Sequence, residues 1–166
     1  MDFLCKIIAT FFFLGNSPKM PGTMGTVGAA IVYSILLVFE CLNFYVLLSC
    51  MLAASILNIL IGKWAENYYQ TKDPQKVVID EVAGYFMTVM CFQPSWEVAI
   101  FGFIAFRIFD IWKPYPVCKV EKFPHGFGVL ADDLLAGVYA AILLLAIGYA
   151  LPFITTAWSI TLFQFV

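Results

Sequence analysis

Three groups of ionisable residues interrupt a chain that is otherwise strongly apolar. Each group lies at the edge of a hydrophobic segment, and the members are Asp80 and Glu81, then Arg107, Asp110 and Lys113, then Asp132 and Asp133. A charged side chain at the centre of a membrane helix costs about 2.5–3.5 kcal/mol, so charged residues grouped beside such helices are candidate functional residues. The pattern indicates an ionic site at one face of a membrane.

The acidic residues suit a hard divalent cation. Five carboxylates brought together would repel one another and raise one another's pKa unless cations compensated their charge. Oxygen ligands favour Mg²⁺ or Mn²⁺, and Mg²⁺ is usually bound by one or two carboxylates together with water and phosphate oxygens. We therefore predict a Mg²⁺ site, and the candidate metal-binding and catalytic residues are Asp80, Glu81, Asp110, Asp132 and Asp133.

The basic residues suit an anion. Arg107, Asp110 and Lys113 are spaced by three and lie within about a 120° arc of one helix, so the acid can face a metal while the cations face a phosphate. Arginine suits bidentate recognition of phosphate, and lysine supplies a point charge. This middle group therefore predicts phosphate binding beside the metal.

A stretch rich in glycine and hydroxyl side chains, residues 16–28, leads into the first long apolar segment. Its glycines let the backbone approach a ligand closely, and a helix N-terminus offers free N–H groups to an anion. The stretch is not a Walker A loop, because the Gly-Lys-Ser/Thr ending is missing. With the one histidine included, the candidate phosphate-binding residues are Arg107, Lys113, Ser17, Gly22, Thr23, Thr26 and His125.

Each group also has a purely structural interpretation. The first member of each acidic pair could cap a helix N-terminus, and the second could be a first-turn acid favoured by the helix dipole. Asp110 differs, because it lies near the end of an apolar segment, where the dipole disfavours an acid. A structural ion pair with Arg107 or Lys113 is the alternative for that residue.

The composition identifies the class of protein that must position these groups. The chain is 63% hydrophobic and 12% charged, whereas soluble domains are about 45–50% apolar and about 25% charged. Its net charge of −2 argues against nucleic acid as a partner. The five cysteines show no metal-binding spacing and are interpreted as small apolar side chains. We predict one domain, residues 1–166, with an all-α fold: a polytopic integral membrane helical bundle.

About four to five apolar helices are expected. The apolar segments are Val27–Phe39, Leu42–Gly62, Val82–Phe92, Val98–Trp112 and Leu134–Leu151. A full span needs about 20 residues, and the first, third and fourth segments are short by that measure. The apolar residues 7–14 lack the strongly basic flank and cleavage site of a secretory signal, so we expect them to remain in the mature protein.

Lysine placement predicts the orientation of the bundle. If the helices cross alternately, one side carries all the lysines, which are Lys6, Lys19, Lys63, Lys72, Lys76, Lys113, Lys119 and Lys122. The opposite connections carry only Glu40 and Glu97. Cytoplasmic loops are enriched in basic residues, so the lysine-bearing side is predicted to be cytoplasmic. The three charged groups and residues 16–28 all fall at that end.

The motifs together resemble those of the phosphatidylglycerophosphatase A family. They occur in family order over most of the chain, as Ser17–Thr26, Asp80–Gly84, Phe106–Pro116, His125–Gly128 and Asp132–Gly137. The resemblance implies a Mg²⁺-dependent phosphatase of the bacterial inner membrane that converts phosphatidylglycerophosphate to phosphatidylglycerol. A phospholipid substrate and membrane lipid are then the expected partners, and no obligatory protein partner is inferred.

Two other functions are compatible with acids in a membrane protein. A CDP-alcohol-type lipid phosphotransferase also uses aspartates at a membrane face, but its Asp-Gly-x2-Ala-Arg motif is missing here. A small ion transporter would need acids near the middle of the membrane, whereas these lie at one edge. We therefore expect metal-assisted attack by water on a phosphomonoester, with Arg107 and Lys113 neutralising phosphoryl charge.

Overall fold

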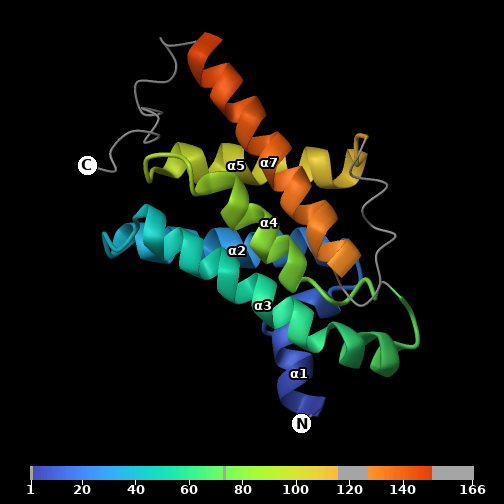
Figure 1. The fold of residues 1–166 in the computed structure, drawn as a ribbon. Coiled ribbons are helices and arrows are strands. Elements are labelled where there is room, and N and C mark those ends of the chain that lie inside the picture. Colours follow the sequence, from blue (N-terminus) through green and yellow to red (C-terminus); the bar gives the residue numbers. More distant parts are fainter. Residues whose placement is uncertain (1, 73, 116–126, 151–166) are drawn as a thin grey trace.

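The computed structural model describes residues 2–72, 74–115 and 127–150, and that part of the chain is helical with no strand (Figure 1). The α-helices are α1 (Asp2–Ala9), α2 (Pro21–Val38), α3 (Phe44–Tyr69), α4 (Ile79–Val89), α5 (Trp96–Trp112) and α7 (Phe127–Ala150), with a 3₁₀ turn at Leu14–Asn16. The predicted all-α class is confirmed.

Three of the five apolar helices can cross a membrane by length and composition. These are α2, α3 and α7, with 18, 26 and 24 residues. Helix α4 has 11 residues, which rise only about 17 Å against a hydrocarbon core of about 30 Å. The expected number of apolar helices is therefore found, but α4 does not span.

Helices α2 and α7 begin earlier than the sequence pattern predicts. Helix α2 starts at Pro21 rather than at Val27, because proline suits the first position of a helix, where its missing N–H costs nothing. Helix α7 starts at Phe127 rather than at Leu134. Asp132 and Asp133 therefore lie in the second turn of a helix and not at its opening, which rules out capping for that pair.

Helix α4 lies at the centre of the bundle, among α2, α3, α5 and α7 (Figure 1). Nine of its 11 residues are buried. The surrounding helices turn apolar faces outward, as on α5, where Ile100, Ile104, Ile108 and Ile111 are exposed at helical spacing. Such a surface suits contact with lipid, and it leaves α4 protected inside the protein.

A glycine contact sets the distance between α4 and α7. A Cβ atom on Gly137 would lie 2.5 Å from the carbonyl oxygen of Gly84, so neither helix tolerates a larger side chain there. The Thr88 hydroxyl donates to the Gly84 carbonyl at 3.0 Å and contacts the Gly137 carbonyl at 3.4 Å. Small residues of this kind allow close packing of membrane helices. Because Asp80 and Asp133 each lie one turn before one of these glycines, the same contact brings the two acids together.

The ends of the helices that carry the charged groups gather on one side of the bundle. In Figure 1, the first residues of α2, α4 and α7 and the last residues of α3 and α5 lie toward the right of the view. The N-terminal segment supports this end, because the Val78 amide, just before α4, donates to the Ala9 carbonyl at 2.8 Å. Helix α1 in turn contacts α3, where the Trp64 indole donates to Asp2 at 3.0 Å.

Candidate functional site

Three carboxylates from two helices form a compact cluster. One oxygen from each of Asp80, Glu81 and Asp133 lies within 4.8 Å of the other two. Asp80 and Asp133 are only 2% and 4% exposed. Val78 precedes α4 without a side-chain cap, and Asp80 accepts a hydrogen bond from the Glu81 amide at 3.1 Å. Asp80 is therefore a first-turn acid of α4 rather than its N-cap.

The three-carboxylate cluster fits a divalent cation. Octahedral Mg²⁺ ligands lie about 3.0 Å apart when adjacent and about 4.2 Å apart when opposite, given Mg–O distances of about 2.1 Å. Oxygens that already lie within 4.8 Å of one another can therefore reach one ion after closing by up to about 2 Å. Glu81 Oε2 is buried and has no hydrogen-bond partner among the described residues, which leaves a ligand position to be satisfied. Burial, and then the adjacent Asp80 carboxylate, raise the pKa of Glu81 well above its usual range. A nearby cation would favour the charged form instead.

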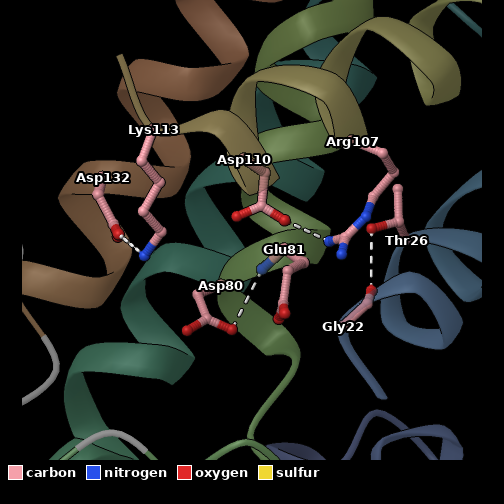
Figure 2. Close-up of polar contacts among 8 residues, drawn as sticks. All are labelled: Gly22, Thr26, Asp80, Glu81, Arg107, Asp110, Lys113 and Asp132. Carbon is pink, nitrogen blue, oxygen red and sulfur yellow. Dashed lines mark hydrogen bonds and ion pairs between the residues drawn. The ribbon is translucent and has the colours of Figure 1, made fainter. Parts of the chain in front are cut away.

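The other two predicted acids form ion pairs. Asp110 accepts from Arg107 within the last turns of α5, and Asp132 of α7 accepts from Lys113 Nζ at 2.5 Å (Figure 2). Adjacent residues on a helix point about 100° apart. Asp133 therefore faces the cluster while Asp132 faces Lys113. The five candidate acids are thus arranged as one group of three and two cation-paired carboxylates.

A pocket of about 520 Å³ is lined by the three-carboxylate cluster and by basic side chains. Asp80, Glu81 and Asp133 line it together with Arg107, Asp110 and Lys113. Apolar side chains, including Met20, Ile111 and Val129, complete the lining. We call this the carboxylate pocket. It brings together acids that can hold a metal and bases that can hold a phosphate, next to apolar side chains that suit a lipid.

The glycine-rich stretch contributes mainly its backbone. A Cβ atom on Gly22 would overlap Glu81 Oε1 and would lie 3.3 Å from Arg107 Nη1, so only glycine lets α2 approach these groups. Thr26 is buried and donates to the Gly22 carbonyl at 3.0 Å (Figure 2). The Thr23 hydroxyl is buried with no partner among the described residues.

Three of the predicted phosphate-binding residues do not line the carboxylate pocket: Ser17, Thr23 and Thr26. The Ser17 hydroxyl donates to the Lys19 carbonyl at 2.9 Å and lines a neighbouring pocket instead. His125 lies outside the described residues. Gln75 lines the carboxylate pocket but was not predicted, because it follows a turn and belongs to no charged group. No signal in the sequence singles it out.

The family comparison decides the class of the protein. The family model described as phosphatidylglycerophosphatase A matches residues 7–148. This chain belongs to the phosphatidylglycerophosphatase A family. The match includes the three-carboxylate cluster and both ion pairs. As a member of this family the protein is a phosphatase, and the predicted enzyme class is confirmed.

Individual relatives agree with the family assignment. Phosphatidylglycerophosphatase A from Escherichia coli is 36% identical over 148 residues, covering 88% of this chain and 84% of that protein. Its Haemophilus influenzae namesake is 30% identical over 145 residues, covering 86% and 88%. A Bacteroides thetaiotaomicron protein named "Putative phosphatidylinositol-3-phosphatase" is 40% identical over 150 residues, covering 86% and 92%. No solved structure gives a significant match to this member of the phosphatidylglycerophosphatase A family.

Proposed function

We propose that the protein hydrolyses the terminal phosphomonoester of phosphatidylglycerophosphate to phosphatidylglycerol and phosphate, with Mg²⁺ as cofactor. The observation that carries this proposal is the carboxylate pocket, in which three clustered acids lie beside Arg107 and Lys113. The substrate is supported by the name of the family and of its Escherichia coli member. The family alone implies a phospholipid substrate more generally.

The residues suited to hold Mg²⁺ are Asp80, Glu81 and Asp133. When bound there, the ion would supply charge neutralisation and polarisation of the phosphoryl group. Arg107 lines the pocket, and its buried Nε has no hydrogen-bond partner among the described residues. Its guanidinium can therefore hold a phosphate oxygen while Asp110 fixes its orientation. Lys113 adds a second positive charge and is positioned by Asp132.

Hydrolysis then needs only water and a proton acceptor. The water oxygen attacks phosphorus, the bond from phosphorus to the glycerol oxygen breaks, and a carboxylate of the pocket accepts the water proton. The same carboxyl group then returns this proton to the leaving glycerol oxygen, which becomes the hydroxyl of the product. Burial of Asp80 and Asp133 strengthens their charge interactions, because the surrounding dielectric constant is lower than in water.

A comparison of lipid substrates tests the proposed reaction. Purified protein in detergent micelles is expected to release phosphate from phosphatidylglycerophosphate at a higher kcat/KM than from phosphatidylinositol 3-phosphate. The second lipid is the necessary competitor, because the Bacteroides relative is named for it. Faster release from the inositol lipid would contradict the proposed substrate while leaving the phosphatase class intact.

The proposed location is the bacterial inner membrane, with the carboxylate pocket at the cytoplasmic face. Lysines support this orientation, since Lys63, Lys72 and Lys76 lie at the pocket end of α3 and in the segment that follows it. Phosphatidylglycerophosphate is a lipid, so its acyl chains would remain among apolar surfaces such as the outer face of α5. Membrane-impermeant thiol labelling of single-cysteine variants in a cysteine-free background tests the orientation.

Cysteines at positions 40 and 97 are expected to label in cells whose outer membrane has been opened. Cysteines at positions 72 and 119 should label only after the inner membrane is opened too. The reason is the excess of basic residues in cytoplasmic loops. Labelling at 72 or 119 before that step would reverse the proposed orientation.

A further inference from the structure

A second pocket adjoins the carboxylate pocket. It encloses about 650 Å³, and its polar lining includes Ser17, Tyr69, Thr71, Gln75 and Lys76. Pro21 and Gln75 line both pockets, so the two pockets are adjacent at those residues. We call the second one the lysine pocket.

The lining of the lysine pocket has a different chemistry from that of its neighbour. Lys76 is its one charged residue, and none of the described lining residues is a carboxylate. The Tyr69 hydroxyl is buried with no hydrogen-bond partner among the described residues, and Lys76 Nζ lies 6.0 Å from the centre of the Tyr69 ring. A single cation beside hydrogen-bond donors suits a singly charged anion. No carboxylate among the described lining residues would require a metal ion to offset its charge.

The position of Lys76 is fixed by the backbone. A Cβ atom on Gly15 would overlap the Lys76 carbonyl oxygen, so the N-terminal segment packs directly against the segment that carries the lysine. The neighbouring Val78 amide bonds to Ala9, which ties the same two segments together again. The backbone on two sides of the lysine pocket is therefore held together by direct contacts, and the exposed Lys76 side chain extends from it.

We propose that the lysine pocket binds the internal phosphodiester of the lipid headgroup while the terminal phosphomonoester lies in the carboxylate pocket. This inference rests on the proposed function. The proposed function assigns a site to the phosphomonoester only, and the inference assigns one to the phosphodiester. A phosphatidylglycerophosphate headgroup carries two phosphates joined by one glycerol, so it needs two adjacent anion sites of unequal charge. The two adjacent pockets supply a metal-suited site for the doubly charged phosphomonoester and a lysine site for the singly charged phosphodiester.

Kinetics of a Lys76→Ala variant test the assignment. The KM for phosphatidylglycerophosphate should rise about tenfold, the usual effect of losing one charge-assisted hydrogen bond, with kcat largely unchanged. Tyr69→Phe, which removes only the hydroxyl, should raise the KM in the same direction by less. Lys63→Ala is the matched control, because Lys63 is exposed on α3 and lines neither pocket.

Soluble inhibitors distinguish binding of a phosphodiester in the lysine pocket from binding of free phosphate in the carboxylate pocket. Glycerophosphoglycerol, which has the phosphodiester but no phosphomonoester, should inhibit the wild-type protein competitively and inhibit Lys76→Ala about tenfold less. Inorganic phosphate should inhibit both proteins equally, since it competes in the carboxylate pocket. An unchanged KM in Lys76→Ala, or a loss of inhibition by inorganic phosphate alone, would overturn the inference.

A direct measurement of glycerophosphoglycerol binding tests this inference separately from the proposed function. If the wild-type protein released no phosphate from phosphatidylglycerophosphate, the proposed function would be wrong. Calorimetric titration with glycerophosphoglycerol would still decide the role of the lysine pocket. Binding that is weakened in Lys76→Ala and kept in Lys63→Ala supports the assignment, and equal binding or none by all three proteins refutes it.

Discussion

Asp133→Asn is expected to reduce kcat for phosphate release by at least about a hundredfold. Substituting even outer-sphere partners of a metal site costs 10- to 100-fold, and Asp133 is one of the three acids close enough to bind the ion itself. Asparagine keeps the shape of the side chain but removes its charge, so packing against α4 should be preserved. Phosphate release and thermal unfolding in the same detergent are the two measurements.

Stability separates loss of function from loss of fold. Without a divalent cation, three buried carboxyl groups crowd one another. Replacing one of them with a neutral amide relieves this crowding, so Asp133→Asn should unfold at the same temperature as the wild type or higher. Asp132→Asn should behave differently, because it deprives the half-buried Lys113 of its ion-pair partner, and it should lower the unfolding temperature. Glu97→Gln is the control, since Glu97 is exposed at the opposite end of α5. Wild-type turnover in Asp133→Asn would remove this residue from the site.

Arg107→Lys is expected to reduce kcat by about a hundredfold, while the Mg²⁺ concentration that gives half-maximal rate stays nearly constant. Lysine keeps the positive charge but cannot bind Asp110 and a phosphate oxygen with the planar fork of arginine, and a single lost contact to developing charge costs about 10²–10³ in kcat. Steady-state rates at varied lipid and varied Mg²⁺ measure both quantities in one experiment.

The partner of Arg107 provides a matched test. Asp110→Asn should weaken turnover by releasing the guanidinium, and combining it with Arg107→Lys should cost little more than Arg107→Lys alone, because both act on one contact. Additive losses would show that Asp110 acts independently, as a metal ligand. A greatly raised Mg²⁺ requirement in Arg107→Lys would show that the assignment of anion and metal roles is wrong.

Charge at the edges of apolar segments was enough to predict the helical membrane fold and the end of the bundle that carries the site. Each acidic pair precedes an apolar segment, and the cost of burying charge confines such pairs to the first turns of a helix. The length of α4 was not predictable in the same way. From the sequence alone, an apolar helix of 11 residues cannot be distinguished from a short membrane-spanning helix. Only the tertiary structure shows that four other helices surround it.

The separate roles of adjacent acids depend on tertiary contacts. Asp132 and Asp133 have the same residue type and near-identical sequence context, and only the packing of α7 against α4 and α5 directs one to Lys113 and the other to the three-carboxylate cluster. The lysine pocket could not be predicted from the sequence either, because it also depends on tertiary contacts. Ser17 and Lys76 lie 59 positions apart, and the contact of Gly15 with the Lys76 backbone that brings them together has no local signal.

The most direct test of a metal-dependent site is the Mg²⁺ dependence of phosphate release from phosphatidylglycerophosphate. Purified protein is stripped with a chelator, returned to detergent micelles of the lipid, and titrated with Mg²⁺. We predict no release in the chelator, saturable recovery as Mg²⁺ is added, and no comparable recovery in Asp133→Asn. Full release by the wild-type protein in excess chelator would contradict the assignment of Asp80, Glu81 and Asp133 to a metal centre.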